Sequence, residues 1–172
     1  MLTQSAFLTT FGRIRGEQQK MGGLSEDSYK EVAKLTYDGM LEMRRLSYST
    51  QADYGKWLIS SIFLMHGSAI AGLAFRASAT GMPPYLSAVL WFVFGMILAL
   101  GAGFSAWWNF SAAADQYNTW AKPAMLFDQS SWPTEAAKAR EIEATKWLSI
   151  GCGVLSVVAL LGGAVHVLWT WK

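Results

Sequence analysis

The chain has 172 residues, of which 52% are hydrophobic and only 15% are charged, and its formal net charge is +2. An average soluble domain carries roughly 25% charged residues, so this composition is typical of a membrane protein. A net charge this small does not by itself indicate a nucleic-acid-binding protein. The chain has a single cysteine, Cys152, which excludes a disulfide bond within one copy.

The N-terminal segment, residues 1–24, is polar with a few apolar side chains on one helical face. Arg13 and Arg15 lie beside that face. The pattern fits a short helix lying on anionic lipid. It fits a partly ordered tail equally well, and both interpretations stay open.

A helix is predicted from Ser25 onward. Ser25 is a good N-cap, and Glu26 and Asp27 follow in the first turn, where the helix dipole favours acidic side chains. Charged residues then recur every fourth position, which is typical of a solvated helical face. Because no proline occurs from Ser25 to Met82, we expect residues 25–56 to continue directly into the first membrane segment.

Three runs of the sequence contain no Asp, Glu, Lys or Arg. A helix needs about 20 apolar residues to cross the hydrocarbon core of a bilayer, and each run reaches approximately that length. The predicted membrane segments are residues 57–76, 85–109 and 147–171.

Two connections join the predicted membrane segments. The first is an external turn over residues 77–84, where Gly81, Pro83 and Pro84 break the helix. The second, residues 110–146, is predicted as helix, loop and helix. Its first helix should stop before Pro123, and the following helix should begin between Ser131 and Thr134.

The distribution of Lys and Arg predicts the orientation. Eight of them precede the first membrane segment and four lie in the second connection, whereas Arg76 and Lys172 are the only two on the other side. The positive-inside rule therefore places the N-terminus and residues 110–146 in the cytoplasm and the C-terminus outside. The expected fold is an all-α membrane protein, with three transmembrane helices extended into a cytoplasmic helical bundle.

Small and polar residues form a stripe along the third membrane segment, spaced alternately three and four positions apart. Small residues allow membrane helices to approach closely, but a polar stripe can also line a water-filled pore, and both uses stay open. We call these residues the Ser149–Thr170 stripe: Ser149, Cys152, Ser156, Ala159, Gly163, His166 and Thr170.

The first two membrane segments show weaker versions of the same pattern. In the second, the pattern consists of Gly95, Ala99, Ala102, Ala106 and Asn109. Stripes on three helices exceed what one helix pair needs, so we expect a tight bundle that also forms a homo-oligomer. In the first segment the pattern is the Ser60–Ala74 face, a second candidate for helix packing or pore lining: Ser60, Gly67, Ala71 and Ala74.

His66 lies in the middle third of the first membrane segment. An ionisable residue at that depth is a functional candidate, here for gating. The plainer alternative is a neutral histidine that bonds to a serine or to backbone. No Asp or Glu occurs within the three segments, which argues against a metal site and against a carboxylate proton relay.

Basic residues precede the first membrane segment, and two uses are open for them. They can contact lipid headgroups and set the topology. In a symmetric oligomer they can also form a collar that binds an anionic ligand such as a nucleotide. The residues are Arg13, Arg15, Arg44, Arg45 and Lys56.

The sequence contains no recognisable catalytic motif. It has no glycine-rich phosphate loop, no GxSxG, no HExxH and no CxxC. We therefore expect no catalytic residues, no metal, no cofactor and no enzyme activity.

One arrangement of residues resembles a known family. The charged stretch Glu42–Leu46 leads into a membrane hairpin, which is followed by Trp107–Phe110 and Asp115–Tyr117 at the start of a cytoplasmic helix. Over residues 41–117 this resembles the two-helix SLATT membrane effectors, although the third membrane segment departs from their pattern. The resemblance implies an oligomeric pore-forming effector of bacterial anti-phage defence in the bacterial inner membrane, controlled by a nucleotide or oligonucleotide signal from a partner enzyme. It assigns no binding residues.

The sequence thus favours an oligomeric membrane channel or membrane-disrupting effector, gated on its cytoplasmic side. The alternative is a structural or accessory subunit of a larger membrane complex. A transporter or membrane enzyme ranks last because the chain lacks the buried carboxylates and internal repeats expected of one.

Overall fold

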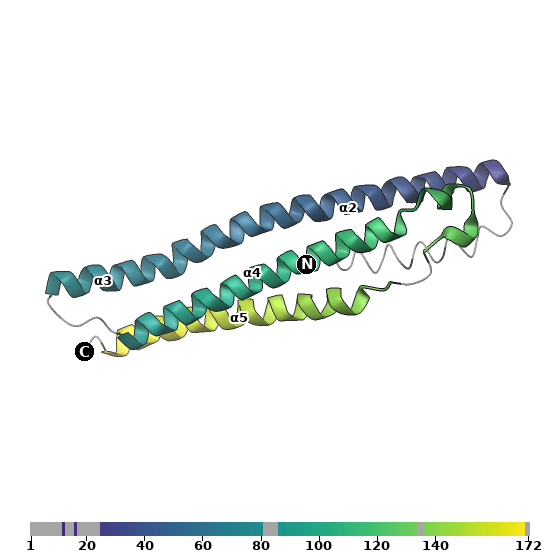
Figure 1. Ribbon diagram of the computed structural model, residues 1–172. Helices are drawn as coiled ribbons and strands as arrows, with labels where there is room; N and C mark the ends of the chain where they lie inside the picture. Colours follow the sequence, from purple (N-terminus) through teal and green to yellow (C-terminus); the bar gives the residue numbers. More distant parts are fainter. Residues whose placement is uncertain (1–11, 13–15, 17–24, 81–85, 134–135, 171–172) are drawn as a thin grey trace. The chain divides into compact units, whose positions relative to one another are not determined.

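The computed structural model describes residues 12, 16, 25–80, 86–133 and 136–170, which are helical apart from turns and a short connection (Figure 1). Apart from residues 12 and 16, the predicted helix or tail over residues 1–24 lies outside the described residues, as does the second half of the predicted external turn, residues 81–84, whereas residues 77–80 are helical. Contacts divide the chain into two compact units. The first unit comprises Met1–Thr50 and Phe110–Ile142, and the second comprises Gln51–Asn109 and Glu143–Lys172.

Helix α2 spans Glu26–Ile62, and its first turn is capped by Ser25. The Ser25 hydroxyl accepts from the Ser28 backbone N–H at 3.4 Å, and Glu26 forms an ion pair with Lys30 at 2.6 Å. The Lys30 ammonium lowers the pKa of the Glu26 carboxyl, and the carboxyl in turn raises the pKa of Lys30. These contacts place the start of α2 where the sequence predicted it.

The helix that follows Glu26 is interrupted by one irregular turn. The π-helical turn η2, Phe63–Gly67, separates α2 from helix α3, Ser68–Thr80. No sequence pattern predicted this turn, since it contains neither proline nor an Asp, Glu, Lys or Arg. Short π-helical turns inside α-helices occur frequently at functional sites.

Helix α4 spans Leu86–Trp120 and ends before Pro123, as predicted. Helix α5 spans Ala139–Thr170. Its predicted start between Ser131 and Thr134 is wrong, because Trp132 precedes Pro133 and is extended, with ψ of 148°. A residue before proline is disfavoured in helical geometry. Two short 3₁₀ turns, η3 (Pro123–Leu126) and η4 (Gln129–Ser131), occupy the connection instead.

Three helical stretches of the described residues are long and apolar enough to cross a membrane: Glu26–Thr80, Leu86–Trp120 and Ala139–Thr170. The prediction of an all-helical chain with three such stretches is confirmed.

The first unit is built around buried aromatic and aliphatic side chains. Trp132 donates its indole N–H to the Tyr29 hydroxyl and to the Met125 carbonyl, both at 3.1 Å, and the Tyr29 hydroxyl donates to the same carbonyl at 2.7 Å. The connection is thereby fixed to α2. The buried cluster around these contacts consists of Ala33, Met40, Ala112, Ala113, Tyr117, Trp120, Met125, Trp132 and Ile142.

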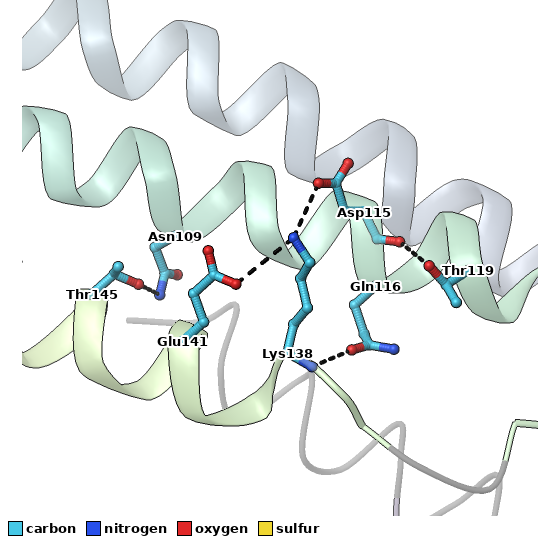
Figure 2. Close-up of polar contacts among 7 residues, drawn as sticks. All are labelled: Asn109, Asp115, Gln116, Thr119, Lys138, Glu141 and Thr145. Carbon is cyan, nitrogen blue, oxygen red and sulfur yellow. Dashed lines mark hydrogen bonds and ion pairs between the residues drawn. The ribbon is translucent and has the colours of Figure 1, made fainter.

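Polar side chains position the start of α5 in the first unit (Figure 2). Gln116 is buried, and its Oε1 accepts from the backbone N–H of Lys138 at 2.8 Å. The Lys138 ammonium forms ion pairs with Asp115 at 3.4 Å and with Glu141 at 3.7 Å. The buried amide thus binds a backbone donor that lies just before the helix, while the ion pairs lie at the surface.

These two kinds of contact should differ in their effect on stability. Gln116→Leu leaves a backbone donor without its acceptor and should lower the free energy of unfolding by about 1–3 kcal/mol. Lys138→Met removes only partly exposed ion pairs and should cost about 0–1 kcal/mol. Chemical unfolding of the two variants in detergent would measure the difference, and equal losses would contradict the assigned role of Gln116.

Candidate functional site in the apolar helices

The Ser149–Thr170 stripe lies against α4 in the second unit. The Ser149 hydroxyl donates to the Ala102 carbonyl at 2.9 Å, and the Ser156 hydroxyl donates to the Gly95 carbonyl at 2.7 Å. The two bonds lie seven residues apart on each helix, which is the repeat that keeps one face of a helix against its partner. The numbers rise on α5 as they fall on α4, so the two helices run antiparallel.

Small residues of the stripe let the two helices approach closely. A Cβ built on Gly163 would lie 2.7 Å from a ring atom of Phe92, and a Cβ on Gly101 would lie 3.7 Å from the Cys152 sulfur. Ala159 is 1% exposed and would lie 3.2 Å from a Cβ on Gly95. Ser156, Ala159 and Gly163 therefore belong to the internal contact between α4 and α5.

The same contact continues toward both ends of the helices. His166 Nε2 lies 2.6 Å from the Ser87 hydroxyl of α4, whereas the Thr170 hydroxyl donates within α5, to the His166 carbonyl at 2.8 Å. At the opposite end, the Asn109 amide donates to the Thr145 hydroxyl at 2.9 Å (Figure 2). Thr170 itself is exposed.

His66 belongs to the π-helical turn η2 and is 4% exposed. Its Nε2 lies 3.3 Å from the hydroxyl of Ser156. Its ring also packs against Gly95, because a Cβ built there would clash with the imidazole Cε1 and lie 3.1 Å from Nδ1. The structure thus brings His66 of the first apolar stretch together with one residue of α4 and one of α5.

The Ser60–Ala74 face is arranged differently. Ser60, Ala71 and Ala74 are exposed, and a Cβ built on Gly67 meets no described atom within 4 Å. The buried residues of the same stretch are Ile62, His66 and Leu73, of which Leu73 clusters with Ala88 and Phe92. The small and polar residues of this face are therefore not the ones that pack inside the chain.

Two of the predicted basic residues line an open groove of about 580 Å³ in the first unit. Arg44 donates to the Asn118 side-chain carbonyl at 2.8 Å. Carboxylates of the same groove offset part of the positive charge. The lining residues are Asp38, Leu41, Glu42, Arg44, Arg45, Tyr48 and Asn118. Lys56 is exposed in the second unit, and Arg13 and Arg15 lie outside the described residues.

Within the described ranges, no three side chains of the His, Cys, Asp and Glu type come together as metal ligands. In the loop of the first unit, hydrogen bonds from Ser130 hold the pKa of Asp128 below its ordinary value. Asp128 accepts from the Ser130 backbone N–H at 2.9 Å and thereby caps η4.

The sequence analysis singled out the stripe, the face and His66, and it offered a serine as one partner for His66, but it did not say which helices lie against them. The spacing of Gly95 and Ala102 on α4 was the available signal for a contact with α5. No sequence pattern indicated that His66, Ser156 and Gly95 lie together, since these residues are far apart in the chain. No protein-family model, curated protein or solved structure matches this chain.

Proposed function

We propose that this chain crosses the membrane three times and assembles into a homo-oligomeric channel or membrane-disrupting effector. The observation that carries the proposal is the Ser60–Ala74 face, which is small, partly polar and not packed inside the chain. Because the Ser149–Thr170 stripe contacts α4, the Ser60–Ala74 face is the surface left for close contact with other copies or for lining a pore.

The large apolar side chains of the second unit support its membrane insertion. Many of them are more than half exposed, which is unfavourable in water but suits contact with lipid. Examples at successive positions along the helices are Leu64, Phe75, Leu90, Ile97, Phe104, Val157, Leu161, Leu168 and Trp169.

We further propose that the N-terminus is cytoplasmic and that the cytoplasmic part controls the channel. The Lys and Arg distribution supports this orientation. The resemblance to SLATT effectors supports a role in bacterial anti-phage defence with a nucleotide or oligonucleotide signal made by a partner enzyme. The groove that contains Arg44 and Arg45 is the candidate site for that anionic signal.

The test combines oligomeric mass with ion flux. The purified protein in nanodiscs should have a mass that is a defined multiple of 18.9 kDa, and liposomes containing it should leak ions, either constitutively or after a nucleotide is added. A monomer that never conducts would contradict the proposal and favour an accessory subunit of a larger membrane complex.

A matched pair of variants would locate the contact between copies. Ala71→Leu enlarges a residue of the Ser60–Ala74 face and should shift the mass toward monomer and reduce flux, because bulk prevents close helix approach. Val158→Leu enlarges an exposed residue of α5 that is outside the stripe and should change neither. If both variants assemble like the wild type, this face is not the contact.

A further inference from the structure

His66 occupies an unusual position even for a buried histidine. It lies in the π-helical turn η2, with its ring enclosed between Gly95 of α4 and Ser156 of α5. Its Nδ1 is buried and has no hydrogen-bond partner among the described residues. Buried polar atoms are normally hydrogen-bonded, and an exception calls for an explanation.

The hydrogen bonds around His66 fix which ring nitrogen carries the proton. A serine hydroxyl has one hydrogen, and Ser156 donates it to the Gly95 carbonyl at 2.7 Å. The contact between Ser156 and His66 at 3.3 Å must therefore use a hydrogen on Nε2, with the serine oxygen as acceptor. A neutral imidazole has only one N–H, so Nδ1 carries an unshared lone pair.

Protonation of His66 would add a hydrogen on Nδ1, where the structure provides no acceptor. The ring lies directly against the backbone at Gly95, which leaves no room for a side chain there. Within the charge-free parts of α4 and α5, the other titratable groups are Cys152, beside Gly101, and His166, which contacts Ser87. No Asp, Glu, Lys or Arg lies within residues 77–114 or 147–171, so no carboxylate on α4 or α5 compensates an imidazolium at this depth.

We propose that His66 is a proton-binding site that releases the first apolar stretch from α4 and α5 when it is protonated. This inference rests on the proposed membrane channel for its functional meaning, but the proton site can be measured independently of conduction. The π-helical turn provides the movement. If η2 returns to α-helical geometry, α3 rotates relative to the end of α2 by about 100°, the share of one residue in a helical turn. That rotation would reorient Ala71 and Ala74 of the Ser60–Ala74 face.

The first readout is structural and uses the full chain in nanodiscs. Because the protein has only two histidines, nitrogen NMR of ¹⁵N-histidine-labelled protein can follow each ring, with His166→Gln to assign the signals. We expect His66 to carry hydrogen on Nε2 alone near neutral pH. As Nδ1 is protonated, backbone amide exchange across residues 62–68, relative to its intrinsic rate at each pH, should rise. If release takes up one proton, the ratio of released to packed states grows by up to about tenfold for each unit that the pH falls.

The second readout is ion flux from liposomes between about pH 8 and about pH 5, the range in which histidine titrates. Wild type and His166→Gln should both respond to acid, while His66→Gln, which retains an amide donor for Ser156, should assemble normally and lose the response. A hydrogen on Nδ1 near neutral pH, or an acid response that persists in His66→Gln, would overturn the proposal.

The two readouts separate failure of this inference from failure of the proposed function. If acid-dependent exchange requires His66 but the protein never conducts, the proton site stands and the channel proposal fails. If the protein conducts while neither flux nor exchange depends on His66, the channel proposal stands and the proton site is wrong.

Discussion

Trp132→Ala is expected to lower the free energy of unfolding of the first unit by about 3–5 kcal/mol, the usual cost of truncating a buried tryptophan. The side chain is 2% exposed. Its removal would create a cavity in the cluster that contains Tyr117, Met125 and Ile142. It would also remove the indole donor that joins the connection to Tyr29 of α2.

Phe127→Ala is the matched control, because Phe127 lies in the same connection and is 79% exposed. Its truncation should change stability by no more than about 0.5 kcal/mol. Amide exchange of α2 residues 29–40 in detergent would report on the first unit directly. If these amides were equally protected from exchange in both variants, Trp132 would not be the residue that stabilises the connection.

The three long helices were predictable because each of them depends on residues that are close together in the sequence. Runs without charge predict apolar helices, Ser25 predicts the start of α2, and Pro123 predicts that α4 ends before it. The start of α5 was predicted too early. Trp132 is held extended by Pro133 and by hydrogen bonds to residues far away in the sequence, which a local pattern does not reveal.

The candidate site was predictable only in part, since its residues belong to three separate helices. The alternating spacing of the Ser149–Thr170 stripe indicated a shared face, but the pattern could not show that α4 covers it. The length of the first charge-free run placed His66 at its centre, whereas the turn η2 and the bond to Ser156 depend on contacts between helices. A pattern of small residues on one helix predicts a close contact with another helix, but it does not identify that helix.

The close approach of His66 to α4 has a consequence that stability measurements can test. Gly95→Ala should destabilise the second unit by about 1–3 kcal/mol, the typical cost of overpacking a filled core. The added Cβ would clash with the imidazole and lie 3.2 Å from Ala159. Neither neighbour is the end of a long flexible side chain, so the helices themselves must separate.

Gly101→Ala is the control on the same helix, one to two turns further along. There the added Cβ would meet only the Cys152 sulfur, at 3.7 Å, which is ordinary contact. Alanine is the better helix former by roughly 0.8–1.0 kcal/mol in peptides, so this variant should be neutral or slightly more stable. Denaturant titration in mild detergent, followed by circular dichroism, would compare the two variants.

A double-mutant cycle would identify His66 as the cause of the loss. In a His66→Ala background the ring is absent, so the added Cβ at Gly95 should cost much less than it does in the wild type. The two substitutions should therefore be non-additive by about 0.5–3 kcal/mol, as expected for residues in contact. Additive losses would mean that Gly95 and His66 do not touch, and the geometry on which the proposed proton-binding site depends would then be wrong.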